Sequence, residues 1–300
     1  MRAAAFAEPG PPDVLRLHDL PEPQAGPGEV RVRVRFAGVQ PFDAALRGGW
    51  VPPYAAVTLP QPPGNEFAGV VDQGTEAVPA GTEVLGFSVF GAYAEYIVVP
   101  QDQVTPKPPS VPWEVAGGFT AGWQTARLAL TEIGVGPGDT VLINAAAGAT
   151  GTAGVQLARI MGATVIGTAS ESNQDYVSSL GAIPVVYGPG LADRARALAP
   201  GGFTASIDGA GGEGLETSLE LVPDRKRIIT LVAHDRIEEL GLANIQGRRS
   251  AAALAELIAL YASGRTQWHV RRVYPLAEAA DAHREIETGH GRGKIVLSVG

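Results

Sequence analysis

The sequence has 300 residues, of which 45% are hydrophobic and 18% charged, with 39 glycines, 24 prolines and no cysteine. This length suits about two domains of roughly 150 residues each, and the absence of cysteine excludes both a disulfide framework and thiolate metal sites. The formal net charge of −8 argues against a nucleic-acid surface, which needs an excess of basic charge.

No apolar stretch approaches the roughly 20 residues that a membrane span requires. The N-terminal run Met1–Phe6 is followed too soon by Glu8, Pro9 and Gly10 to be a signal peptide. We therefore expect a cytoplasmic protein that binds neither a membrane nor nucleic acid.

Residues 1–112 carry short strand patterns that proline and glycine interrupt. Val30–Phe36 alternates apolar residues with arginine, which is the period of a strand with one buried face. Further β-rich runs are Phe67–Asp72, Glu83–Phe87 and Tyr93–Val99. These patterns predict a small, mainly antiparallel, barrel-like domain over residues 1–112.

After the proline-dense stretch Pro100–Pro112 the chain alternates helices with short apolar strands. The predicted strands are Asp139–Ala145, Ala163–Ala169, Pro184–Val186, Phe203–Ile207 and Arg227–Val232. The predicted helices are Trp113–Thr131, Thr150–Met161, Asn173–Leu180, Leu191–Leu198 and Ala251–Ala262. The fold class is therefore α/β, with a doubly wound parallel sheet over residues 113–265. Residues 266–300 return to short strands.

A loop of small residues follows the apolar strand Thr140–Asn144 and opens a helix. We assign Gly148 to its tight turn, Gly151 to the close approach of a pyrophosphate, and Gly154 to helix–strand packing. Free amides and the helix dipole would hold the anion. Because strand, loop, helix and second strand have the expected spacing, dinucleotide binding is favoured over an ordinary glycine turn. The candidate cofactor-binding residues here are Ala145, Ala147, Gly148, Ala149, Thr150 and Gly151.

The end of the second strand indicates which dinucleotide binds. An NAD enzyme places Asp or Glu there for the ribose hydroxyls, whereas this chain has Ala169 and Ser170. Ser170 could donate to a 2′-phosphate, so the sequence favours NADPH. Its basic partner would have to be Arg248, Arg249 or Lys294, because no Lys or Arg lies nearby.

Several other chemistries are excluded by inspection. No Tyr has Lys four residues later, no Gly-x-Ser-x-Gly segment is complete, and no Gly-Lys-Ser/Thr segment occurs. The five histidines show no metal-ligand spacing. Hydride chemistry without a metal remains.

Several short segments carry a family resemblance over nearly the whole chain. They are Pro27–Val32, Gly38–Asp43, Gly64–Val71, Gly91–Tyr96, Ala145-x-x-Gly148-x-x-Gly151, Asp208–Gly212 and Gly291–Leu297. Together they resemble the medium-chain dehydrogenase/reductase superfamily, in its zinc-free quinone oxidoreductase branch. Zinc-dependent relatives carry Cys near position 40 and His at position 65, where this chain has Gln40 and Asn65. The resemblance implies a GroES-like catalytic domain over residues 1–112, a Rossmann cofactor domain over 113–265, and a segment 266–300 that rejoins the first.

The resemblance also implies NADPH, no zinc, a homodimer, and hydride transfer to a quinone, an enone or an enoyl thioester. Tyr54 matches the active-site Tyr of the branch, although it could instead cap a proline-rich loop. Gln40 and Asp43 match its polar pair beside the substrate. Asp43 could be catalytic, or it could instead serve as the cap of the helix Asp43–Leu46. Thr120 looks like the Thr that contacts the nicotinamide, or else a helix Thr bonded to its own backbone.

Aromatic residues and a histidine complete the expected site. The substrate-pocket candidates are Trp50, Tyr54, Phe90 and His234, with Phe87 and Trp123 as further wall residues. The aromatic side chains could equally be core, His234 could lie in a surface loop, and Glu66 is assigned a structural role.

We therefore predict an NADPH-dependent, zinc-free reductase of quinones or other conjugated carbonyls. One alternative is a biosynthetic enoyl or ketone reductase for a single metabolite. The other is an NADP-binding sensor or partner protein without turnover.

Overall fold

The computed structural model describes all 300 residues, which form two compact units. The first comprises Met1–Ala121 with Ser250–Gly300, and the second comprises Gly122–Arg249. The boundaries differ from the predicted 112 and 265 because helices α2 (Trp113–Gly117) and α8 (Ala251–Ala262) pack against strands of the first unit.

A seven-stranded sheet forms the frame of the first unit. Its strand order is β13-β14-β3-β4-β5-β7, with β6 paired to β3, and every pairing is antiparallel except that of β13 with β14. The strands are β3 (Glu29–Val39), β4 (Glu66–Gln73), β5 (Glu83–Phe87), β6 (Tyr96–Pro100), β7 (Val104–Pro106), β13 (Val270–Pro275) and β14 (Lys294–Ser298).

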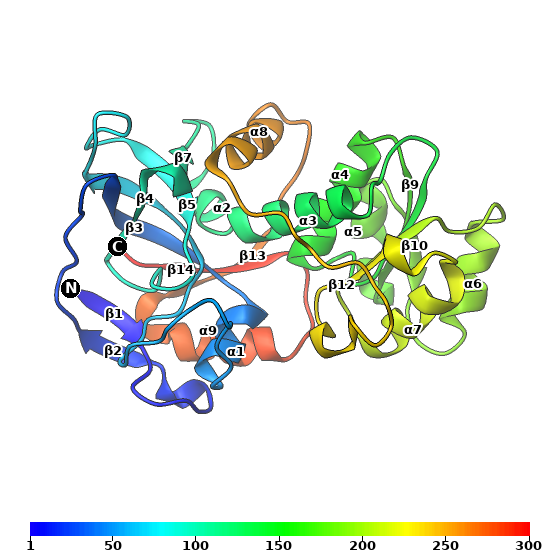
Figure 1. Cartoon of the computed structure of the whole chain (residues 1–300), viewed down its shortest axis with the longest axis horizontal. Helices are drawn as coiled ribbons and strands as arrows, with labels where there is room; N and C mark the ends of the chain where they lie inside the picture. The colour runs from blue at the N-terminus through cyan, green and yellow to red at the C-terminus, as the bar shows by residue number, and fades with distance from the viewer. The chain divides into compact units, whose positions relative to one another are not determined.

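Segments from both ends of the chain meet in this sheet. The red strand β14 lies beside the blue strand β3 in Figure 1, with Gly38 opposite Val296. Strands β1 (Arg2–Ala5) and β2 (Arg16–Asp19) form a separate antiparallel pair. Helix α1 (Pro41–Arg47) packs against the C-terminal helix α9 (Ala279–Glu287).

A five-stranded parallel sheet forms the second unit, in the order β10-β9-β8-β11-β12. Its strands are β8 (Thr140–Ile143), β9 (Thr164–Ala169), β10 (Ile183–Val186), β11 (Ala205–Asp208) and β12 (Ile228–Thr230). Its helices are α4 (Ala149–Ile160), α5 (Gln174–Ser179), α6 (Leu191–Leu198) and α7 (Gly212–Leu221), and α3 (Thr120–Glu132) enters it from the first unit. This order confirms the doubly wound sheet, and its direction reverses between β8 and β11, where such sheets bind ligands.

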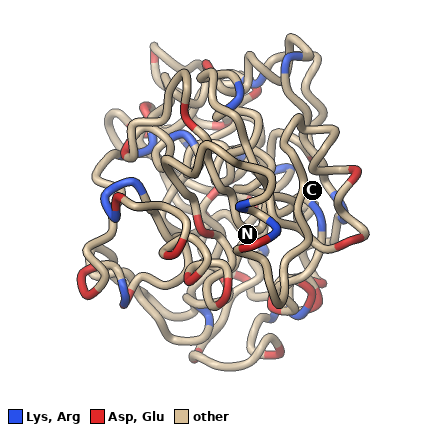
Figure 2. The backbone as a smooth tube through the Cα atoms, turned by 90° about the vertical axis from the view of Figure 1, so that its right-hand side faces the viewer, with Lys and Arg blue, Asp and Glu red and all other residues tan.

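Charged residues of both signs are interspersed along the backbone (Figure 2). The arginines of β3 point away from the core, whereas Val30, Val32 and Val34 are buried. No helix is long and apolar enough to cross a bilayer.

Candidate functional site

The turn between β8 and α4 has an unusual backbone. Ala145 has a φ of 57°, and it is the one non-glycine residue of the chain with positive φ. Its N–H donates to Thr168 Oγ1 at 3.1 Å, and the Ala146 N–H donates to the Thr168 carbonyl at 2.9 Å. An L residue in this region is strained, and these two bonds from the neighbouring strand hold the chain there.

The first turn of α4 presents backbone amides that no side chain caps. Gly148 is the N-cap and has no side chain, and the Thr152 N–H makes the bond to the Gly148 carbonyl at 2.8 Å. The amides of Ala149, Thr150 and Gly151 precede that bond, and the first amides of a helix have no intrahelical acceptor. With the positive end of the helix dipole they suit an anion such as a pyrophosphate.

The structure adds to the expected role of Gly151. A Cβ there would overlap the Ala145 carbonyl oxygen and lie 2.7 Å from Ala146 Cα. Gly151 therefore allows the helix to pack on its own preceding turn, a role additional to the expected approach of a pyrophosphate. A Cβ on Gly154 would meet Ile143 Cδ1 at 3.4 Å, an ordinary contact, so helix–strand packing does not require a glycine there as we had expected.

Buried polar side chains terminate the central strands of this sheet. Asn144 donates to the Gly214 carbonyl at 2.8 Å and accepts from Thr168 Oγ1 at 3.2 Å. Asp208 accepts from Thr230 Oγ1 at 2.8 Å. Neither residue was among the predicted site residues, although each is a polar side chain at the carboxyl end of an apolar strand.

Ser170 belongs to a cluster of uncharged side chains at the end of β9. Its Oγ accepts from Asn173 Nδ2 at 3.0 Å and lies 3.1 Å from Ser172 Oγ. Gln174 Nε2 donates to the Ala169 and Ser170 carbonyls at 3.0 and 3.1 Å. These hydrogen-bonded side chains are uncharged, and the one carboxylate beside them in the sequence, that of Glu171, is exposed.

Lys294 does not fit the role of basic partner to that phosphate. Its Nζ lies 2.6 Å from Glu66 Oε1, with the two side chains 3% and 0% exposed. Its charge is balanced inside the first unit, which contradicts our expectation for this residue.

The predicted polar residues of the first unit lie in one buried network. Gln40 Nε2 donates to Asn65 Oδ1, and the Gln40 N–H donates to Asp43 Oδ2 at 3.1 Å. Asp43 also accepts from the Gly64 N–H at 3.2 Å and closes a capping box with Gln40 at the start of α1. Asp43 is fully buried, so the structure favours its capping role over a catalytic one.

Two residues that the sequence analysis missed extend this network. Tyr93 OH donates to Asp43 Oδ2 at 3.0 Å and lies 3.2 Å from His283 Nε2, while Arg47 lies 3.3 Å from His283 Nδ1. Because an arginine only donates, Nδ1 accepts and Nε2 carries the proton. Burial raises the pKa of Asp43 to about 7 against the opposing charge of Lys294. Burial, with Arg47 adjacent, lowers the pKa of His283 to about 3.

The aromatic pocket candidates separate into exposed and buried residues. Trp50 packs edge-on against Phe42 at 5.6 Å between ring centroids, and Phe90 stacks on Phe42 at 6.3 Å. Tyr54 is 76% exposed and makes no hydrogen bond, so it neither caps its loop nor reaches Gln40. By contrast, Phe87 and Trp123 are buried and belong to the core.

The remaining candidates differ in exposure. His234 is exposed at the start of a short 3-10 helix after β12, as a surface histidine would be. Thr120 is fully buried at the start of α3, and its Oγ1 has no hydrogen-bond partner. This rules out the alternative in which Thr120 bonds its own backbone.

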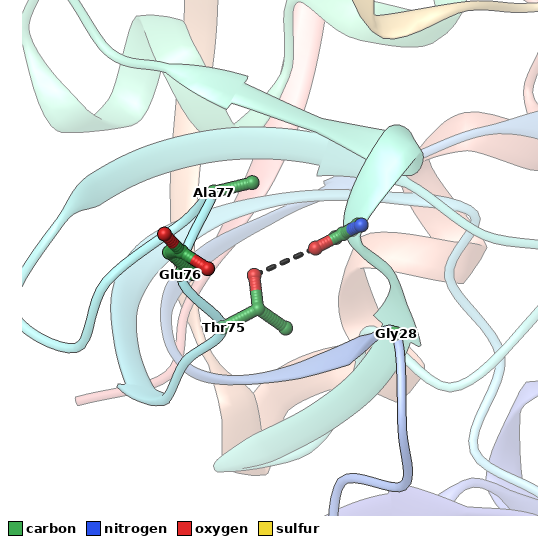
Figure 3. A pocket seen from close by; sticks show the side chains of 5 residues that line it. Gly28, Thr75, Glu76 and Ala77 are labelled. Atoms are coloured by element: carbon green, nitrogen blue, oxygen red, sulfur yellow. Dashed lines mark hydrogen bonds between the residues drawn. The ribbon is translucent and has the colours of Figure 1, made fainter.

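A separate surface pocket of about 670 Å³ contains none of the predicted residues. Gly28, Thr75, Glu76, Ala77 and Gln101 line it, and Thr75 donates to Gln101 at 2.6 Å (Figure 3). No group of three or more His, Asp or Glu side chains could hold a metal ion.

Comparison with known proteins identifies two matching families. Residues 26–109 match the alcohol dehydrogenase GroES-like domain, and residues 180–297 match the zinc-binding dehydrogenase family. The quinone oxidoreductase of Mus musculus is 29% identical, over 99% of this chain and 97% of that protein.

Two solved structures have the same fold along their whole length. The quinone oxidoreductase from Coxiella burnetii superposes with a TM-score of 0.87 at 28% identity, covering 100% of this chain and 99% of that one. A mycobacterial protein solved as a complex with NADPH superposes with a TM-score of 0.86 at 29% identity, covering 100% of both chains.

Proposed function

Since the chain belongs to the medium-chain dehydrogenase/reductase superfamily, in its quinone oxidoreductase branch, we propose that it is a zinc-independent reductase that uses NADPH to reduce quinones or other conjugated carbonyls. The observation that carries the proposal is the uncapped first turn of α4, which follows the left-handed Ala145 at the switch point of the parallel sheet. A mycobacterial relative of the same fold holds NADPH.

The first turn of α4 fits the pyrophosphate of a dinucleotide. The amides of Ala149, Thr150 and Gly151 would hold the pyrophosphate, and no side chain competes for them. The unpartnered hydroxyl of Thr120 would bond the nicotinamide carboxamide. Since that hydroxyl is buried, neighbouring side chains must move for the contact to form. When bound, the reduced nicotinamide supplies a hydride.

The uncharged cluster around Ser170 supports NADPH over NADH. Carboxylates that select NAD bind the ribose hydroxyls from the end of the second strand and repel a 2′-phosphate. Here β9 ends at Ala169 and Ser170, and the carboxylate of Glu171 lies one residue further on and is exposed. The hydroxyl of Ser170 would donate to the phosphate.

Clustered aromatic side chains support a flat, conjugated substrate. Phe42 and Phe90 are partly buried and Trp50 is exposed in one contiguous cluster, and the exposed Tyr54 hydroxyl is free to donate. Without a metal, hydrogen-bond donors must stabilise the developing oxyanion, and we assign this role to Tyr54, with Gln40 orienting the neighbouring loop. Replacing Tyr54 by Phe should lower kcat by about 10²-fold if it donates the proton. An unchanged kcat would reduce Tyr54 to a packing residue.

The direct test is oxidation of NADPH, followed at 340 nm, with 1,4-naphthoquinone and separately with an α,β-unsaturated ketone. We expect turnover of the quinone that metal chelators do not diminish, and a higher kcat/KM with NADPH than with NADH. Turnover of the ketone alone would instead favour a dedicated enone reductase. Binding of NADPH without oxidation by either substrate would contradict the proposal.

A further inference from the structure

A buried ion pair in the first unit spans three neighbouring strands. Lys294 on β14 and Glu66 on β4 meet across β3, at 2.6 Å between Nζ and Oε1. At this point β3 has Gly38, where a Cβ would overlap the Glu66 carboxylate. A Cβ on Gly118 would lie 2.8 Å from Lys294 Cγ. The two glycines therefore leave the space that the ion pair occupies.

The second oxygen of Glu66 binds the start of α3. Glu66 Oε2 accepts the N–H of Ala121 at 2.6 Å, and α3 begins one residue earlier, at Thr120. The first amides of a helix lack intrahelical acceptors, and the positive end of the helix favours a carboxylate. Without Glu66, the Lys294 ammonium would oppose that positive end. One carboxylate thus satisfies both a buried cation and a helix terminus.

The Thr120 hydroxyl adjoins this contact. It is buried without a hydrogen-bond partner, and a buried hydroxyl of this kind destabilises the protein until a partner binds it. Because the Ala121 amide is the next main-chain group, its bond to Glu66 fixes the backbone that directs the Thr120 side chain.

We propose that Glu66 is a positioning residue for coenzyme binding, and that Lys294 balances its charge. Its carboxylate holds the first turn of α3 so that the Thr120 hydroxyl is placed to bond the nicotinamide. This inference rests on the proposed function, and it assigns Glu66 a role beyond stability.

The test uses Glu66→Gln. Glutamine has only one side-chain oxygen, which can accept from either the Ala121 N–H or the Lys294 ammonium. Its amide nitrogen only donates, so whichever of these two donors faces the nitrogen loses its acceptor. We expect the Kd for NADPH, measured by coenzyme fluorescence, to rise about tenfold while the protein stays folded. Adding Lys294→Met removes the cation and frees the glutamine oxygen for Ala121. The double variant should therefore return to within about threefold of the wild-type Kd.

Glu95→Gln is the matched control. Glu95 also accepts a backbone amide and pairs with a cation, at 2.7 Å from the Arg2 N–H and 3.1 Å from Arg2 Nε, but on the surface. Its Kd for NADPH should not change. Glu66→Asp keeps the charge and shortens the reach, so it should weaken binding even if Glu66→Gln fails to fold.

A wild-type Kd in folded Glu66→Gln or Glu66→Asp would overturn the inference, as would a double variant no tighter than the single one. Failure of the folded wild-type protein to bind NADPH would overturn the proposed function together with it.

Discussion

At the scale of single residues, burial shifts the pKa values of Asp43 and His283 in opposite directions within one hydrogen-bond network. Both lie next to Tyr93, whose own pKa burial raises well above its usual value, so that the hydroxyl stays protonated and donates to Asp43. Burial keeps Asp43 protonated to a pKa of about 7 and keeps His283 neutral down to about 3. Asp43 and His283 are therefore both neutral over much of the acidic range, and Arg47 is the charged donor in the network.

The two groups should nearly cancel in the pH dependence of stability. The unfolded chain loses the Asp43 proton above pH 3.8 while the folded chain keeps it to about pH 7, so the contribution of Asp43 to stability falls with rising pH in that window. In the unfolded chain His283 becomes protonated below pH 6.5, whereas in the folded chain it stays neutral down to about pH 3. The contribution of His283 to stability therefore rises with pH in that window. Between about pH 4 and 6.5 these slopes oppose each other.

Replacing Asp43 by Asn removes the pH dependence of stability that Asp43 causes and leaves the one that His283 causes. We expect the free energy of unfolding of Asp43→Asn, relative to wild type, to increase by about 1–3 kcal/mol between pH 4.5 and 6.5. Replacing His283 by Gln should give a change of the opposite sign. Urea unfolding at several pH values measures both, and two variants whose profiles run parallel to the wild type would contradict this account.

At the scale of elements, the β8–α4 turn depends on close main-chain packing. Replacing Gly151 by Val would push the first turn of α4 away from the Ala145 carbonyl. We expect the Kd for NADPH to rise by about tenfold or more, because the amides lose their convergence on one anion. Gly201→Val is the control, since Gly201 lies in the same unit with open space around it. Titration with NADPH distinguishes the two variants. Equal affinities would contradict a role for Gly151 in shaping the anion site.

Helices α7 and α9 show where sequence patterns were insufficient. Helix α7 begins Gly212-Glu213-Gly214, and these glycines look like a continuing turn. Helix α9 is amphipathic, but the side chains that it buries fully, Ala279, Ala282 and His283, are small or polar and do not mark a core-facing helix in the sequence. In contrast, Leu191–Leu198 and Ala251–Ala262 were predicted to the residue, because both are rich in the helix-favouring residues Ala and Leu.

The residues of the candidate site also divide into those that the sequence could predict and those that it could not. The glycine loop was visible because its function depends on consecutive residues and their backbone. Tyr93 and His283 were not. Tyr93 reaches Asp43 from 50 residues further along the chain, His283 reaches Tyr93 from a further 190 residues, and only the folded unit brings them together. The ion pair of Lys294 with Glu66 likewise forms only through the pairing of β14, β3 and β4.

At the scale of the whole molecule, the two units differ in which parts of the chain build them. The parallel unit is made from one uninterrupted stretch, Gly122–Arg249, whereas the antiparallel unit needs both ends of the chain. The domain plan was predictable in outline because the alternation of helices and strands changes twice. The exact limits were not, since α2 and α8 carry helical patterns but pack on the β-sheet unit.

The place of β14 beside β3 has a consequence for biosynthesis. While a ribosome is still adding residues 250–293, the stretch Gly122–Arg249 has all five strands of its sheet, but the Phe36–Val39 part of β3 lacks its neighbour on one edge. That edge closes only when Lys294–Ser298 leaves the exit tunnel. The nascent polypeptide therefore matures out of order, with its middle portion able to fold before its beginning.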